Sequence, residues 1–490
     1  MRGRHPRALH LLVSATLLAG CAVGPDFHPP APPRVSGYSP RPLSATESAP
    51  SRAGASQRFV QGMDIPGQWW TLFRSAALNV LIARSLKANP SIDSAQAALR
   101  QATETMYAQQ GAYFPSISVT PTVSRNLTPI KALSAATASG NPYYTLITPQ
   151  LSVSFVPDVF GANRRAVESL AAQAEAQRFQ LEATYLTLTS NVVAGAVQEA
   201  SLRGQIAAAE ETIRIDANLL AILRRQNALG QVAMADVLAQ EATLAQARQA
   251  LPPLQKQLAQ QRDQLAALSG GFPSEELSQT FTLDSLRLPR ELPLSLPSRL
   301  VAQRPDVRAA EANLHAASAQ IGVAVAARVP QISLTATLGS TALQVGNLFA
   351  PGYNFWTVAG SLTQPIFEGG ALLHRQRAAR AAFDQAAAQY RSTVLSAFQN
   401  VADTLHALQS DAVALRAAAA ADSAAARSLA IVRQQLRLGQ VAYLSLLNAE
   451  QTSQQARLAL VQAQANRFAD TAALFQALGG GWWNRADVAG

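Results

Sequence analysis

The sequence has few of the residues that proteins use for catalysis, metal binding or a disulfide framework. One cysteine among 490 residues excludes internal disulfides and any multi-cysteine zinc site. Two of the six histidines lie at the extreme N-terminus and the other four are far apart, and the four methionines do not cluster. No Walker, HExxH or GxSxG motif and no supported pair of carboxylates occurs. These absences argue against an enzyme and predict no bound metal or other cofactor.

Aromatic and charged residues are also scarce. Aromatic residues make up 6% of the chain and charged residues 14%, against roughly 25% charged residues in ordinary soluble domains. The 48% apolar share depends heavily on alanine, which predicts long helices that pack through small side chains. The net charge is +10, but the basic residues form no cluster, so nucleic acid is not an expected partner.

The N-terminus has the features of an export signal. Three arginines precede a mostly apolar stretch, Ala8 to Ala19, which is too short to span a bilayer. It ends in Leu-Ala-Gly-Cys21, which resembles the bacterial lipobox, so residues 1–20 are predicted to be removed and Cys21 to carry covalent lipid. The alternative is an ordinary signal with a chance cysteine. Ala22 is not the aspartate that retains lipoproteins in the inner membrane, which favours the outer membrane.

The rest of the chain is duplicated. Asn89–Thr120 and Arg304–Thr335 align without a gap and share 10 of 32 residues, and Leu229–Glu241 and Leu438–Glu450 share 7 of 13. Compositional bias could produce matching alanines, but not the paired prolines and glycines. The predicted divisions are a lipid-anchored extended tether (21–66), a first repeat (67–275), a linker (276–303), a second repeat (304–481) and a C-terminal tail (482–490).

Each repeat predicts the same order of elements. A helix (about 91–112 or 306–328) ends at a proline, and two extended runs with alternating apolar residues follow, with the length of membrane-spanning β-strands. A helix of about seventy residues comes next (162–229 or 371–438), and after a Leu-Gly-Gln-Val-Ala motif a second helix returns (234–268 or 443–478). The apolar spacing indicates coiled-coil packing.

A sheet in lipid must close, because unpaired backbone groups find no partners in hydrocarbon. Four strands cannot close a barrel, whereas three chains would together supply twelve. The sequence therefore predicts an α+β membrane protein with an internal two-fold repeat, in which several chains form a conduit.

Several motifs together resemble the NodT type of TolC-like outer-membrane efflux lipoproteins, which serve resistance-nodulation-division multidrug pumps. They span nearly the whole mature chain and include Cys21–Pro25, Trp69-Trp70, Arg304–Val307, Gln364–Gly370, Gly439–Glu450 and Ala477–Trp482. The resemblance implies a homotrimer with a twelve-stranded β-barrel continuous with a long periplasmic α-helical barrel. It also implies a passive exit duct that receives substrate from a periplasmic adaptor and an inner-membrane transporter.

The resemblance further implies roles for the turns after the long helices. Gly230 and Gly439 match glycines that contact the adaptor, although each could serve only as a helix C-cap, and both roles stay open. The gate of the family follows the second turn, where Leu444 matches an apolar position. Ser445 and Asn448 stand where acids are common, which makes an anionic gate doubtful. Asp236, after the first turn, could supply charge or be an ordinary solvated residue.

Two other functions stay open at this stage. A duct for polypeptide secretion would share the fold, and a periplasmic coiled-coil scaffold lipoprotein would share the lipobox and the helices. The two predicted strand pairs favour the efflux duct over the scaffold, because a scaffold has no need of them.

Overall fold

The computed structural model describes residues 23–40, 43–127 and 143–485, so Cys21 lies outside the described residues. The chain divides into two compact units. The strand unit comprises residues 1–30, 99–177 and 310–390, and the helical unit comprises residues 31–98, 178–309 and 391–490. Within the described residues, no helix combines the length and the apolar character needed to cross a bilayer.

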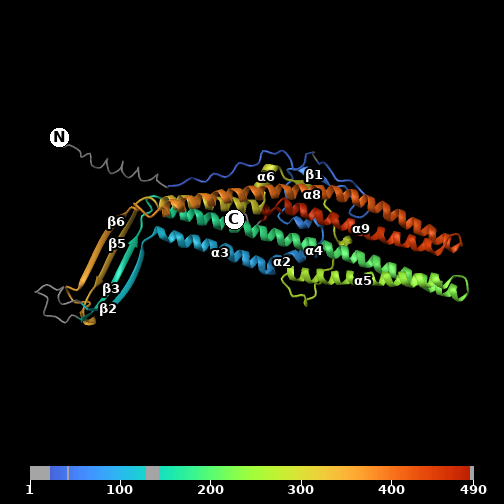
Figure 1. Ribbon diagram of the computed structural model, residues 1–490, viewed down its shortest axis with the longest axis horizontal. Coiled ribbons are helices and arrows are strands. Elements are labelled where there is room, and N and C mark those ends of the chain that lie inside the picture. Colours follow the sequence, from blue (N-terminus) through green and yellow to red (C-terminus); the bar gives the residue numbers. More distant parts are fainter. Residues whose placement is uncertain (1–22, 41–42, 128–142, 486–490) are drawn as a thin grey trace. The chain divides into compact units, whose positions relative to one another are not determined.

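The strand unit contains one four-stranded antiparallel sheet in the order β2-β3-β5-β6 (Figure 1). Each repeat contributes two consecutive strands, as the alternating sequence pattern predicts. The strands are β2 (Ser116–Leu127), β3 (Tyr143–Phe155), β5 (Gln331–Ser340) and β6 (Asn354–Thr363). The short helices η2 (Gly111–Tyr113) and η5 (Val345–Asn347) lie before β2 and between β5 and β6.

The helices repeat in the same order and at almost the predicted boundaries. The helices before the strand pairs are α3 (Pro90–Gln110) and α7 (Pro305–Ala326). The two long helices have 67 residues each, α4 (Ala162–Ala228) and α8 (Ala371–Arg437), and the two returning helices have 35 each, α5 (Met234–Leu268) and α9 (Tyr443–Ala477). The predicted two-fold repeat is therefore present in the structure as two strand pairs and two long helical hairpins.

The helices of the helical unit approach one another closely. A Cβ at Gly195 of α4 would lie 2.7 Å from Leu265 Cδ2, and one at Gly204 would lie 2.9 Å from Val461 Cγ1. A larger residue at either position would displace these side-chain atoms, so glycine lets α4 approach α5 and α9 without such a rearrangement. The two glycines that interrupt the alanine-rich run thus have a packing role.

An aromatic cluster packs within the helical unit. Trp69 and Phe73 lie on η1 (Trp69–Phe73), and Trp69 stacks on Phe475 of α9 at 5.3 Å between ring centroids. All three side chains are at most 1% exposed. The remaining short elements of this unit are α2 (Ala76–Ala88), η4 (Leu283–Ser285), α6 (Pro297–Gln303) and η6 (Trp482–Asn484).

The prediction that residues 21–66 form only an extended tether is wrong for the part that packs in the helical unit. Strand β1 (Arg58–Gln61) pairs in parallel with β4 (Glu291–Leu294), which lies inside the predicted linker. Arg467 of α9, fully buried, donates to Gln57 Oε1 at 2.6 Å and to Thr46 Oγ1 at 3.2 Å. Proline and serine are common in this segment, but its backbone and polar groups find partners far away in the sequence.

Candidate channel-forming sheet and helix tips

The sheet of the strand unit separates apolar from polar residues over most of its length, except near one end of β2 and β3, where Arg125 and Thr145 continue the apolar face and Leu146 lies on the other. On β2, Ile117, Val119 and Val123 share one face, and their partners across β3 are Val153, Leu151 and Ile147. The intervening residues form the other face, with pairs such as Ser116 and Ser154, Ser118 and Ser152, and Thr122 and Thr148. Side chains of successive strand residues point to opposite faces, so this register gives one apolar face and one face rich in hydroxyls.

The second strand pair continues both faces. Leu338 and Ala336 of β5 join the apolar face through Leu151 and Val153, and on β6 they pair with Trp356 and Val358. Trp356 and Val358 are 74% and 73% exposed within the single chain. Exposed apolar area of this kind marks a surface that contacts lipid or protein.

Both edges of the sheet are open. Among the described residues, β2 pairs only with β3, and β6 pairs only with β5. All twelve residues of β2 and all ten of β6 are exposed or half-buried. Unpaired backbone donors and acceptors along a long edge strand are a template for another strand.

The two long helices end in identical turns. At the end of α4 the Gln231 N–H donates to the Gln226 carbonyl at 2.9 Å, and Gly230 has φ +70°. At the end of α8 the Gln440 N–H donates to the Gln435 carbonyl at 2.9 Å, and Gly439 has φ +71°. This is a Schellman cap, whose left-handed residue is best served by glycine.

The C-cap role of both glycines is therefore confirmed, while adaptor contact stays a prediction. Nothing lies within 4 Å of a Cβ built on either glycine, so both tips present open backbone. The leucines that precede them, Leu229 and Leu438, are 68% and 64% exposed.

The four predicted gate residues all lie at the starts of the returning helices. Leu444, Ser445 and Asn448 are exposed on α9, with Leu444 65% exposed, and Asp236 is half-buried in the first turn of α5. The single chain brings none of these four into contact with another of them through a recorded hydrogen bond or ion pair. Their role as a gate stays a prediction.

A buried link between the two hairpins was not predicted from the sequence. The Tyr443 hydroxyl donates to Gln240 Oε1, and Gln240 Nε2 donates to the Asp216 carbonyl at 3.0 Å. Tyr443 is 8% exposed and Gln240 is fully buried. Apolar residues from α4, α5 and α9 surround the link: Leu220, Leu223, Val237, Leu244 and Leu446. The only hint in the sequence was a tyrosine directly after the second Leu-Gly-Gln-Val-Ala motif.

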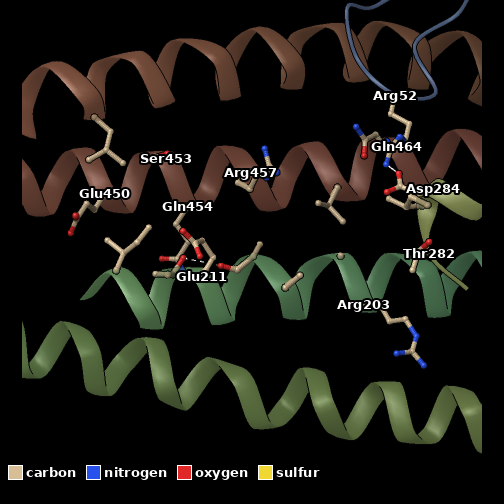
Figure 2. A pocket seen from close by; sticks show the side chains of 18 of the residues that line it. Arg52, Arg203, Glu211, Thr282, Asp284, Glu450, Ser453, Gln454, Arg457 and Gln464 are labelled. Carbon is tan, nitrogen blue, oxygen red and sulfur yellow. Dashed lines mark hydrogen bonds and ion pairs between the residues drawn. The ribbon is translucent and has the colours of Figure 1, made fainter. Parts of the chain in front are cut away.

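A cavity of about 480 Å³ lies between α4 and α9 (Figure 2), and Asp216 is among the residues that line it. Its lining has both signs of charge, with Arg203 and Glu211 from α4 and Glu450 and Arg457 from α9. Burial raises the pKa of Glu450, against the opposing effect of Arg433, whose guanidinium lies 3.2 Å from Glu450 Oε1. No catalytic arrangement of these groups is apparent.

Over residues 23–40, 43–127 and 143–485, no three His, Cys, Asp or Glu side chains come together as a possible metal site.

Known proteins resemble the chain along almost its whole length. The toluene efflux pump outer membrane protein TtgC of Pseudomonas putida is 29% identical over 98% of this chain and 97% of its own. The cation efflux system protein CusC of Escherichia coli is 28% identical over 96% of this chain and 97% of its own. The solved structure of the outer-membrane channel OprN superposes with a TM-score of 0.83, at 26% identity, over 94% of this chain and all of that one.

The family profile described as outer membrane efflux protein matches residues 81–271 and 296–480, which contain both strand pairs and both helical hairpins. The match covers well over half of the chain, and it agrees with the predicted fold, location and efflux role. The chain belongs to the outer membrane efflux protein family.

Proposed function

We propose that three copies of this chain form a passive outer-membrane efflux duct rather than an enzyme. The single observation that carries the proposal is a sheet with one apolar face, one hydroxyl-rich face and two open edges. Pairing β6 of one copy with β2 of the next satisfies both edges, and three copies give a closed barrel of twelve strands. The apolar face then meets lipid and the hydroxyl-rich face lines the lumen.

The proposed anchor is covalent lipid on Cys21, with no other cofactor. Its support is the lipobox in the sequence, since the cysteine lies outside the described residues. Together with the barrel, the lipid would attach the protein to the outer membrane.

The proposed partners are a periplasmic adaptor and an inner-membrane transporter of the resistance-nodulation-division class. The two glycine caps support this, because Gly230 and Gly439 leave backbone uncovered at equivalent tips with an exposed leucine beside each. Such a surface allows the close approach of a partner helix. The helix starts beside the tips, at Leu444, Ser445, Asn448 and Asp236, would form the gate of the assembled duct.

The proposed cargo is small molecules. Relatives of similar length are named for efflux of toluene and of cations and for export of pyoverdine, so the fold carries chemically different substrates. The scattered methionines of this chain offer no path for soft metal ions, which favours organic cargo. Selection of cargo would rest with the transporter.

The test compares two lysine substitutions at neighbouring positions of β6. Val358→Lys puts a charge on the apolar face, which costs about 2–4 kcal/mol near the bilayer midplane, while Thr357→Lys puts it on the hydroxyl-rich face. We expect Val358→Lys to reduce heat-stable trimers in membranes, and Thr357→Lys to keep the trimers but lower their cation selectivity in planar bilayers.

Native mass spectrometry and single-channel recording of the unsubstituted protein complete the test. A trimer with a conductance supports the duct. A lipoprotein that forms no channel would instead support the scaffold function, and equal effects of the two lysines would contradict the assignment of the faces.

A further inference from the structure

The N-terminal residues 23–28 pack against helices of the strand unit instead of trailing from it. The Val23 N–H donates to the Phe160 carbonyl at 3.1 Å. The Arg165 guanidinium donates back, from Nε to the Val23 carbonyl at 3.3 Å and from Nη2 to the Gly24 carbonyl at 3.5 Å. One arginine of α4 thus holds the backbone of two consecutive residues.

Arg165 is itself fixed by two carboxylates. Its Nη2 lies 2.7 Å from Asp26 Oδ1, and its Nη1 lies 2.7 Å from Glu168 Oε2. The side chain of Arg165 is 7% exposed, and that of Asp26 is 81% exposed. The hydrogen bond and the positive charge of Arg165 lower the pKa of Asp26. A buried arginine that reaches out to an exposed aspartate identifies a built contact rather than a chance surface pair.

A second set of contacts joins the same residues to α7. The ring of Phe27 stacks on the ring of His315 at 4.4 Å between centroids, with 10° between the planes. His315 Nε2 lies 2.9 Å from Glu168 Oε1, so the stack and the ion pairs share Glu168. Hydrogen bonds, ion pairs and ring stacking therefore act on one short segment.

The backbone of this segment also fits closely against α7. Gly24 has φ +102°, and a Cβ built on it would lie 2.4 Å from the Cα of Gly322. No other residue could occupy this position without moving one of the two backbones. We call residues 23–28, together with Arg165, Glu168 and His315, the N-terminal clamp.

The clamp lies where helices meet strands. Phe160 follows the end of β3 by five residues, and Gly322 precedes β5 by nine. These strand ends are adjacent in the sheet, because Phe155 pairs with Leu334. Cys21 precedes Val23 by two residues, and two residues of chain span at most about 7 Å.

We propose that the N-terminal clamp fixes the attachment point of the lipid beside the strand ends, so that acyl chains and strands enter one bilayer leaflet at a set separation. The inference rests on the proposed acylation and on the proposed barrel. A flexible tether would attach the protein to a membrane equally well, but it would leave the acyl chains free to explore the bilayer. The clamp makes this connection short and constant.

The test locates the acyl chain directly. Cells that express the full-length protein are fed a palmitate analogue with a photoreactive diazirine, and its adducts are mapped by mass spectrometry of the irradiated protein. Two variants are compared, Arg165→Gln, which removes the clamp arginine, and Arg164→Gln, its exposed neighbour on α4. For the unsubstituted protein and Arg164→Gln we expect adducts concentrated near the clamp, within residues 153–160 and 322–336. Arg165→Gln should spread them along the strands and lower that concentration.

Hydrogen exchange provides the second readout and covers the case in which Arg165→Gln fails to fold. Gly24→Ala leaves the arginine and both carboxylates in place but adds the conflicting Cβ. It should raise amide exchange of residues 23–28 about tenfold or more, while β3 and β5 keep their protection.

The possible outcomes distinguish a failure of the clamp from a failure of the proposed acylation or of the proposed barrel. A protein that incorporates no palmitate overturns the acylation, and one that forms no trimer overturns the barrel. Labelled trimers whose adducts are equally spread in the unsubstituted protein and in Arg165→Gln overturn the clamp alone, as does unprotected exchange of residues 23–28 in the unsubstituted protein.

Discussion

The buried link between the hairpins gives a quantitative prediction for gating. Tyr443→Phe removes a hydroxyl whose partner, Gln240 Oε1, belongs to a fully buried side chain. The substitution leaves that oxygen without its donor, and an unsatisfied buried group costs about 1–3 kcal/mol. Because the tyrosine is on α9 and Gln240 is on α5, the cost falls on the packing of one hairpin against the other.

If opening separates these hairpins, the hydrogen bond between Tyr443 and Gln240 is present only in the closed state. Its loss then destabilises the closed state and leaves the open state unchanged. At the lower limit of about 1 kcal/mol in each of three chains, the closed state loses about 3 kcal/mol, which shifts the closed-to-open ratio by roughly 100-fold. Gln240→Leu in the same chain removes the stranded oxygen, so the double variant should close better than Tyr443→Phe alone.

Single-channel recording in planar bilayers measures the open fraction, and sensitivity of cells to vancomycin reports it in the outer membrane. The matched control is Tyr38→Phe, which removes a hydroxyl that donates to the Ser295 carbonyl at 3.0 Å, away from the hairpins' tips. This control should lower stability and leave gating unchanged. An open fraction in Tyr443→Phe no higher than in the control would refute the role of the link.

Three further predictions concern a buried acid, a helix cap and the gate. Burial and the neighbouring Asp470 raise the pKa of Asp411 to about 7, so the folded state holds a proton that the unfolded state releases near pH 4. The free energy of unfolding should fall between pH 4 and 7 and then level off. Asp411→Asn should remove this fall. At pH 8 it should raise the free energy of unfolding by about 1 kcal/mol, a figure reduced because the side chain is partly exposed, and thermal unfolding measures the change. Gly439→Ala should destabilise the tip by about 1 kcal/mol because its φ of +71° is unfavourable for alanine, although the added Cβ would contact no atom. If antibiotic export falls while conductance is unchanged, the loss of export is assigned to weaker binding of the adaptor. Leu444→Gly should open the channel by removing an apolar side chain, and unchanged conductance and vancomycin sensitivity would move the proposed gate to Asp236.

The helices and strands could be predicted because local signals determine them. The long helix predicted over 371–438 is observed as Ala371–Arg437, since no glycine or proline interrupts it and glycine caps it. The strand pairs could be predicted from apolar alternation after prolines. Within each strand pair the two strands follow one another in the sequence, but the pairing of β3 with β5 joins the two repeats across about 180 residues and could not be read from local signals.

The packed N-terminal segment could not be predicted, because its partners lie far away in the sequence. Arg165 holds residues about 140 positions earlier, and Arg467 holds Gln57 across 410 positions. Proline and serine between residues 22 and 66 are typical of a linker. Composition does not reveal that Gln57 in this segment accepts a hydrogen bond from the buried Arg467. Nothing in the sequence distinguishes Arg165 and Arg467, which are buried, from the many arginines on exposed helix faces.

The buried link shows why a sequence repeat does not predict equal roles for equivalent residues. Met234 and Tyr443 occupy the same position after the repeated motif, yet Met234 is 57% exposed and Tyr443 is 8% exposed. Tyr443 packs beside Gln240 of the first repeat, and the equivalent of that glutamine in the second repeat is Ala449, which has no side-chain hydrogen-bonding group. The contact therefore has no symmetric counterpart. A repeat can give two hairpins the same shape, but a link between them requires different residues on its two sides, and the sequence departs from its own repeat at both of these positions.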